Sequence, residues 1–173
     1  NAEEERLLGV SFTGVYDCPV ILNATPKQLE SLRDVAIKTN KEWAERLGIE
    51  QSVAVTCIKP SGTVSQLTGV SGSGLHPAYA KYYIRRVRQD KKDPLNKALV
   101  DAGVPYCEDP YNSEAWVFSF AVKAPAKSII KDQVDAISHL ETWKKFALHW
   151  CEHKPSVTIY VAEDEWLKVG SWC

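Results

Sequence analysis

The residues best suited to chemistry lie in a polar loop, CIKPSGTVSQLTGVSGSGLHP, at residues 57–77. Its Lys-Pro-Ser-Gly-Thr run separates an apolar stretch from a helix-forming one, so backbone N–H groups and the positive end of a helix dipole would point the same way. Gly62 lets a ligand approach the backbone, and the hydroxyls of Ser61 and Thr63 can rotate to donate to it. Such a loop suits a phosphate group. The alternative, which local chemistry alone favours, is a capped turn in which serine and threonine only complete a helix end.

Two neighbouring features limit what the loop can be. The segment is not a Walker A loop, because the Gly-x-x-x-x-Gly-Lys-Ser/Thr order is absent and Lys59 precedes the glycine. A P-loop kinase is therefore disfavoured. His76, which stands before Pro77 at the end of the loop, is either a phosphate or base contact or a hydrogen-bonding residue of the turn, and the second role is the commoner one.

Three arginines form a second group of candidate anion ligands. Arg85, Arg86 and Arg88 lie in an expected strand beside aromatic residues. Arg85 would point to one face of that strand and the other two to the opposite face. They could neutralise a polyphosphate, or they could pair with the acids around Asp90 and Asp93. The sequence favours neither alternative.

The histidines and cysteines do not form a recognisable metal or disulfide pattern. The HWCEH stretch offers His149, Cys151 and His153, but structural zinc sites normally draw paired ligands from two separated clusters, and no second cluster follows. The five cysteines are odd in number, widely spaced and without a CxxC pair, as in reduced cytoplasmic proteins. They are Cys18, Cys57, Cys107, Cys151 and Cys173. We predict no metal site and no catalytic cysteine in the chain.

Hydrophobic periodicity predicts strands that alternate with helices. Strands are expected at 7–17, 52–58, 81–88, 116–125 and 156–161, and further helices at 63–67, 93–103 and 132–150. The clearest helix begins at Pro26, with Thr25 as N-cap and Gln28 completing a capping box, and ends at Gly48. This order predicts an α/β fold with five mostly parallel strands, part of a barrel or a doubly wound sheet, in a single unit spanning residues 1–173. The polar loop follows the second strand, where such folds bind ligands.

Composition and charge exclude several classes of function. The 173 residues carry a net charge of -1 and a pI near 6.5, so no chain-wide basic field attracts nucleic acid or an anionic membrane. No apolar run is long enough for a transmembrane helix and no secretion signal is found, which favours a cytoplasmic protein. The chain begins at Asn1 without methionine and stops at Cys173 inside an expected helix, so we expect an excised fragment.

Four stretches, in order along nearly the whole chain, resemble the adenosylcobalamin-dependent (class II) ribonucleotide reductases, specifically the monomeric ribonucleoside-triphosphate reductase branch. They are GVSFTGVYD, CIKPSGTVSQLTGVSGSGLHPAYAKYYIRRVR, VKAP and HWCEHKPSVTIYV. The resemblance implies a ten-stranded α/β barrel made of two parallel halves, with this chain forming much of the second half. It also implies that a loop binds the substrate's phosphates through backbone N–H groups and hydroxyls, at Pro60, Ser61, Gly62, Thr63 and Val64. On this basis phosphate binding replaces the capped turn as the favoured interpretation.

The resemblance implies chemistry that this chain cannot complete alone. In the family, adenosylcobalamin generates a thiyl radical on a cysteine of an Asn-x-Cys-x-Glu finger loop, which should lie upstream of the first strand, and no such stretch occurs here. The implied substrate is a ribonucleoside triphosphate, and the implied reductant of the parent enzyme is a thioredoxin-like dithiol carrier. We therefore expect the fragment to be inactive in isolation and not to bind the cofactor alone.

Two other functions stay open. A catalytically inactive, reductase-like nucleotide-binding or interaction module would expose an apolar face of the half barrel and self-associate through it. An unrelated phosphosugar-binding βα enzyme would need a complete acid/base pair, and we find no pair with persuasive spacing.

Overall fold

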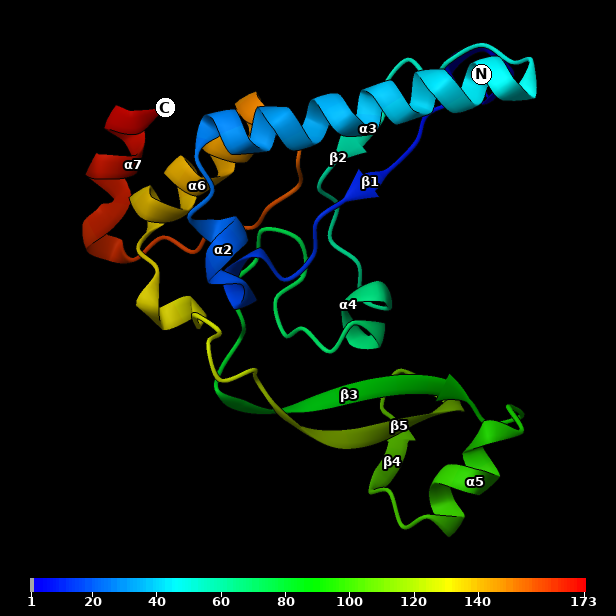
Figure 1. Cartoon of the computed structure of the whole chain (residues 1–173). Helices are drawn as coiled ribbons and strands as arrows, with labels where there is room; N and C mark the ends of the chain where they lie inside the picture. Colours follow the sequence, from blue (N-terminus) through cyan, green and yellow to red (C-terminus); the bar gives the residue numbers. More distant parts are fainter. Residues whose placement is uncertain (1) are drawn as a thin grey trace. The chain divides into compact units, whose positions relative to one another are not determined.

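The computed structural model describes residues 2–173 and divides them into two compact units. Unit 1 contains the residues up to Tyr79 together with Pro125–Cys173, and unit 2 is the intervening segment Ala80–Ala124. Both units contain helices and strands, so the predicted α/β class is confirmed (Figure 1). None of the described helices is both long and apolar enough to cross a membrane.

The strands of unit 1 are short and parallel. β1 (Val10–Ser11) pairs with β2 (Thr56–Cys57), and Val10 lies opposite Thr56. The Val10 N–H donates to the Val55 carbonyl at 2.9 Å. Because β2 leads into the polar loop, this strand pair sets the position at which the loop begins.

The long helix α3 (Pro26–Leu47) confirms the predicted capping signals. The Thr25 hydroxyl accepts a hydrogen bond from the Gln28 N–H at 3.3 Å, and the Gln28 side chain accepts one from the Thr25 N–H at 2.8 Å. The chain leaves the helix at Gly48, whose φ of 67° is left-handed and suits glycine.

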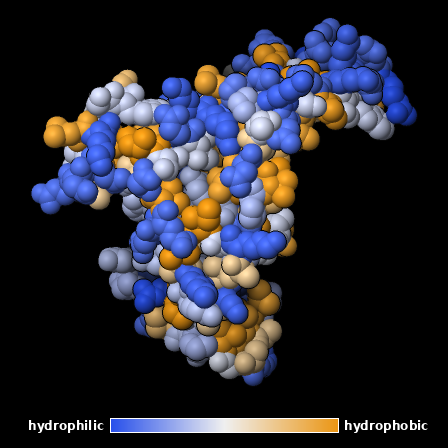
Figure 2. Space-filling model, turned by 60° about the vertical axis from the view of Figure 1, so that its left-hand side comes forward, coloured by the Kyte–Doolittle hydropathy of each residue, from blue (hydrophilic) through white to orange (hydrophobic). Residues whose placement is uncertain are grey.

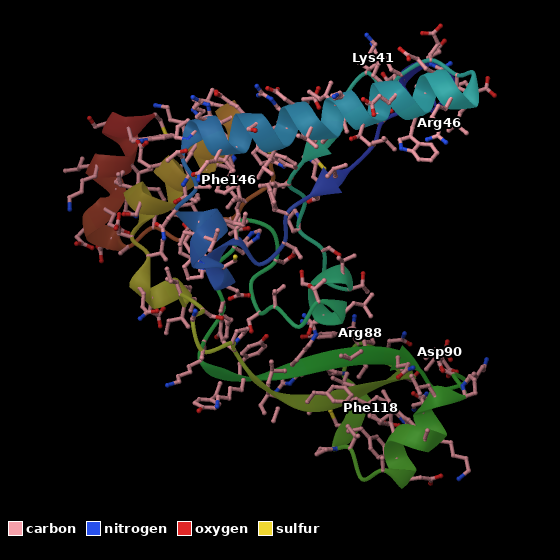
Figure 3. The ribbon with its side chains drawn as sticks, in the orientation of Figure 1. Lys41, Arg46, Arg88, Asp90, Phe118 and Phe146 are labelled. Atoms are coloured by element: carbon pink, nitrogen blue, oxygen red, sulfur yellow. The ribbon has the colours of Figure 1, made fainter. Side chains whose placement is uncertain are left out.

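The core of unit 1 forms where α3 packs against α6 (Ala136–His149). Its buried side chains are Val15, Ala24, Leu29, Ile58, Leu75, Phe146 and Trp150. Figure 3 labels Phe146 in this region. Ile58 and Leu75 lie at the two ends of the polar loop and are completely buried, so core packing fixes both ends of the loop.

The remaining elements of unit 1 are short. They are α1 (Ala2–Glu5), η1 (Val15–Asp17), α2 (Pro19–Leu22), α4 (Val64–Leu67), η2 (Lys131–Gln133), η3 (Glu163–Glu165) and α7 (Trp166–Trp172). The helix α4 confirms the short helix predicted at 63–67. The predicted strand at 156–161 is not found, because the structure assigns no secondary structure to these residues.

Unit 2 consists of an antiparallel sheet and one helix (Figure 1). Its elements are β3 (Tyr82–Asp90), α5 (Leu95–Asp101), β4 (Tyr106–Asp109) and β5 (Asn112–Lys123). The strand order is β3-β5-β4, so β5 pairs with both other strands. Phe118 of β5 is completely buried, with its ring centre 5.5 Å from that of Tyr106. Arg88 pairs with Val117, so Arg88 and Phe118 lie on opposite faces of the sheet, as Figure 3 shows.

The prediction of five mostly parallel strands is wrong. Within residues 2–173 the five strands form one parallel pair and one three-stranded antiparallel sheet. The sequence analysis missed β4, whose tight connection to β5 makes the two strands antiparallel, since parallel neighbours need a long crossover. The Asp109 carboxylate stabilises this turn by accepting hydrogen bonds from the N–H groups of Tyr111 at 2.8 Å and Asn112 at 3.1 Å.

Candidate functional site

The five residues of the expected phosphate site form one turn between β2 and α4. Pro60, Gly62, Thr63 and Val64 are exposed, and Ser61 is half-buried. Thr63 occupies the N-cap position of α4, but its side chain makes no capping hydrogen bond. The structure therefore brings these residues together on the surface of unit 1.

Ser61 is held by Ser73, a residue from the far end of the loop. The Ser61 N–H donates to the Ser73 hydroxyl at 2.6 Å, and that hydroxyl donates to the Ser61 carbonyl at 3.0 Å. The Ser61 hydroxyl accepts a hydrogen bond from the Val64 N–H at 3.0 Å. The capped turn considered as an alternative is thus present, with Ser61 as the capping side chain. Because a hydroxyl both donates and accepts, capping leaves the Ser61 proton for a ligand.

A second set of hydroxyl bonds supports the same turn. Ser65 is almost completely buried and donates to the Ser61 carbonyl at 2.6 Å. Its oxygen lies 2.9 Å from the Thr13 hydroxyl, which also accepts a hydrogen bond from the Gly74 N–H at 3.3 Å. Since the Ser65 proton points to Ser61, Thr13 is the donor in the bond between Thr13 and Ser65. These bonds tie the start of the loop to its end.

Asp17 and Gly72 fix the second half of the loop. One carboxylate oxygen of Asp17 accepts hydrogen bonds from the N–H groups of Ser71 at 2.7 Å and Gly72 at 3.0 Å. A side chain does not fit at position 72, because a Cβ there would overlap the carbonyl oxygen of His76. Sequence analysis missed Asp17, which lies 54 positions before Ser71, since no local pattern joins residues so far apart.

His76 takes the hydrogen-bonding role that its place in the loop favours. Its Nδ1 lies 2.8 Å from the Ser73 carbonyl oxygen, and its Nε2 accepts a hydrogen bond from the Thr158 N–H at 3.0 Å. Both ring nitrogens are thus engaged within the protein. The geometry therefore supports the turn residue rather than a direct contact with phosphate or base.

The residues around β2 hold the strand in place and offer no reactive group to a ligand. Cys57 is buried, and burial, with a smaller effect from Cys57, raises the pKa of Cys151 to about 12. A thiol with this pKa stays protonated at neutral pH and is a poor nucleophile. Glu152 accepts hydrogen bonds from the N–H groups of Val55 at 2.9 Å and Thr56 at 3.0 Å. Burial raises the pKa of Glu152, but these bonds outweigh it and lower the pKa overall.

The arginine group lies in unit 2. Arg88 forms an ion pair with Asp109, whose side chain is buried. A backbone N–H of the following turn has the largest effect and lowers the pKa of Asp109, against the opposing effect of burial, and Arg88 lowers it further. Arg86 is exposed and lines the same surface hollow as Arg88. Arg88 thus pairs with an acidic residue, although not with the two acids closest in sequence.

The HWCEH stretch makes a side-chain hydrogen bond to helix α3. His149 Nδ1 lies 2.7 Å from a carboxylate oxygen of Glu30 on α3. Among the described residues, no three potential metal ligands converge. The pair joins α6 to α3 and is a structural contact.

A solved structure resembles the chain in fold. The crystal structure of a B12-dependent (class II) ribonucleotide reductase matches 98% of this chain and 28% of its own, with a TM-score of 0.79 and 24% sequence identity. The chain therefore has the fold of part of a class II ribonucleotide reductase. No family model matches the sequence.

Curated relatives share a single name, adenosylcobalamin-dependent ribonucleoside-triphosphate reductase. The protein from Levilactobacillus brevis is 30% identical over 85% of this chain, and that from Lactobacillus gasseri is 32% identical over 87%. The protein from Lactobacillus acidophilus is 33% identical over 80% of this chain. The chain spans about a fifth of the length of these relatives, 20%, 20% and 19% respectively. It is thus homologous to a segment of these reductases, which confirms the resemblance seen in its motifs.

Proposed function

We propose that the chain is part of a ribonucleoside-triphosphate reductase and that one turn cradles the substrate's phosphates, at Pro60, Ser61, Gly62, Thr63 and Val64. The observation that carries this proposal is the hydrogen-bond network around Ser61, which holds a hydroxyl-bearing turn at the surface. A phosphate needs several donors in fixed positions and close approach to the backbone. The hydroxyls of Ser61 and Thr63 would supply donors, and Gly62 would allow the approach.

The chain would form one contiguous fragment, residues 1–173, of the catalytic barrel domain and would correspond to its second half. The parallel pairing of β1 with β2 supports this. Helix α3 also leaves apolar side chains uncovered, including Leu32 at 45% and Leu47 at 65% exposure. Figure 2 shows that hydrophobic residues reach the surface in several places. Such surface suits burial against further parts of a reductase.

The parent would use adenosylcobalamin, which supplies radical chemistry when bound, together with a thioredoxin-like dithiol carrier in the cytoplasm. The described cysteines lack the sequence implied for radical generation, because none of them stands in an Asn-x-Cys-x-Glu stretch. Next to the turn, Cys57 is buried and Cys151 is only partly exposed. We therefore place the cofactor in the longer parent and give this chain the task of binding and orienting the triphosphate.

The test is product formation by the polypeptide encoded in the reading frame that contains this chain. We expect an Asn-x-Cys-x-Glu stretch upstream of residue 7, and conversion of a ribonucleoside triphosphate to its deoxy form that depends on adenosylcobalamin and a dithiol. Changing Ser61→Ala and Thr63→Val together should raise KM by roughly tenfold or more, because two phosphate donors are lost. A parent that lacks the finger loop and makes no deoxynucleotide would refute the reductase.

A second candidate function is an inactive interaction module. The exposed apolar residues of α3, which include Val35 at 61% and Trp43 at 50% exposure, favour it, because such a stripe invites self-association. Sedimentation of the chain with and without Val35→Lys would decide. A concentration-dependent dimer that this change disrupts supports the module, whereas a monomer at all concentrations excludes self-association.

A further inference from the structure

His76 connects the network of the candidate turn to another segment of unit 1. On one side, its Nδ1 lies 2.8 Å from the carbonyl oxygen of Ser73, whose hydroxyl bonds both backbone polar groups of Ser61. On the other side, its Nε2 accepts a hydrogen bond from the Thr158 N–H at 3.0 Å. The imidazole therefore joins the turn to the segment that follows α6.

These two bonds fix the tautomer of the ring. A backbone N–H can only donate, so Nε2 is the unprotonated nitrogen, and a carbonyl oxygen can only accept, so Nδ1 carries the proton. The ring meets both partners in one orientation. His76 thus sets the distance between the backbones of Ser73 and Thr158, and Ser73 in turn holds Ser61.

The backbone on both sides of the imidazole is also held. Leu75 is completely buried, and its carbonyl oxygen lies 2.8 Å from Nε2 of the buried His139. Gly72 packs so closely on the His76 carbonyl that no side chain fits between them. His76 is therefore a fixed point from which Ser73 is positioned.

We propose that His76 is a positioning residue for phosphate binding, which acts through Ser73 to orient the Ser61 turn before the ligand arrives. This inference rests on the proposed function of that turn. Donors that are already ordered bind an anion more tightly, because a mobile loop must lose conformational entropy at the moment of binding. The ring itself does not contact the phosphate, since both of its nitrogens are used within the protein.

The test compares the affinity of the 173-residue chain and its variants for tripolyphosphate, read from the amide signals of residues 61–65. His76→Ala removes both imidazole bonds, leaves only the backbone N–H of His76 on the Ser73 carbonyl, at 3.0 Å, and should weaken binding roughly tenfold or more. His76→Asn retains an N–H donor near the place of Nδ1 that can reach the Ser73 carbonyl, so its affinity should stay within about threefold of the native value. His153→Asn is the matched control, because His153 lies outside this network, and its affinity should be native.

Rescue by the asparagine variant separates positioning from simple loss of stability. A His76→Ala variant that binds like the native chain would overturn the inference, and so would an asparagine variant as weak as the alanine variant when both are folded. If His76→Ala does not fold, the asparagine variant and the imidazole 15N signals decide, since the native ring must show a protonated Nδ1 and a hydrogen-bonded Nε2. A native chain whose amide signals at 61–65 do not respond to tripolyphosphate would instead refute the proposed function together with the inference.

Discussion

Two regions of the chain could hold an anion: the Ser61 turn of unit 1 and the arginine-bearing strand β3 of unit 2. They differ in the groups that they would offer to an anion. The turn has hydroxyls and backbone groups whose positions are fixed by bonds to residues distant in sequence, such as Thr13 and Ser73. The strand has charge: Arg86 and Arg88 share one face, yet Arg88 already pairs with Asp109. We therefore expect the turn rather than the arginine-bearing strand to hold the anion, because a phosphate needs donors held in place as well as charge.

The largest expected effect separates the two regions physically. Phe118→Ala removes a completely buried ring from the aromatic cluster of unit 2 and should cost about 3–5 kcal/mol of unfolding free energy. We expect the amide signals of β3, β4 and β5 to lose their native dispersion, whereas tripolyphosphate still shifts those of residues 61–65. Loss of that response in the variant would mean that the turn depends on unit 2, contrary to the comparison.

A smaller effect tests how tightly the loop is built. Gly72→Ala places a Cβ against the His76 carbonyl and should cost roughly 1–3 kcal/mol through overpacking, with weaker tripolyphosphate binding. Gly170→Ala is the matched control in the same unit, because a Cβ there meets open space within α7. Thermal unfolding should show the control unchanged or slightly more stable. Equal behaviour of the two variants would show that the loop is looser than its contacts indicate.

The smallest expected effect is a difference in pH dependence. Burial lowers the pKa of His139, against the opposing hydrogen bond to the Leu75 carbonyl, and a smaller electrostatic effect of His76 lowers it further. The unfolded chain therefore takes up this proton at a higher pH than the folded chain, so unit 1 loses stability as the pH falls below about 6.5. Unit 2 contains no histidine. Because the pKa of Asp109 is lowered, the stability that this carboxylate gives to unit 2 is lost only at more acidic pH.

Urea unfolding at pH 7 and pH 5, followed by amide signals of each unit, measures this difference. Unit 1 should be weakened at pH 5 while unit 2 is not. His139→Gln keeps an N–H near the place of Nε2 but cannot titrate, so it should reduce the pH dependence of unit 1. An equal loss in both units, or an undiminished loss in the glutamine variant, would contradict the assignment to His139.

Local signals were sufficient to predict the longer helices, although not the short helices α1, α2 and η1. The Thr25 and Gln28 capping box and the Gly48 stop depend on neighbours in sequence, and α3 follows them closely. The motif match likewise gave the reductase resemblance. Strand direction could not be obtained in this way, because alternation says nothing about which strands pair, and the Asp109 turn that creates β4 was not recognised.

The turn of the candidate site could be predicted from the sequence, whereas the contacts that hold the turn could not. The Ser-Gly-Thr run marked the turn, yet the residues that hold it are separated from it in sequence, as with Thr13, which lies 52 positions before Ser65. Asp17 and Thr158 carried no local signal at all. The role of His76 as a hydrogen-bonding residue of the loop was anticipated, whereas its second partner depends on the tertiary fold.

The most direct test of the account is an amide-resolved titration of the native chain with tripolyphosphate. If the Ser61 turn is the phosphate site, the signals of residues 61–64 move first and saturate, while those of Arg86 and Arg88 on β3 stay in place. The matched change Arg86→Gln should then leave the affinity within about twofold. Saturating shifts on β3 with no response at residues 61–64 would contradict the account, because charge would then decide the site rather than ordered donors.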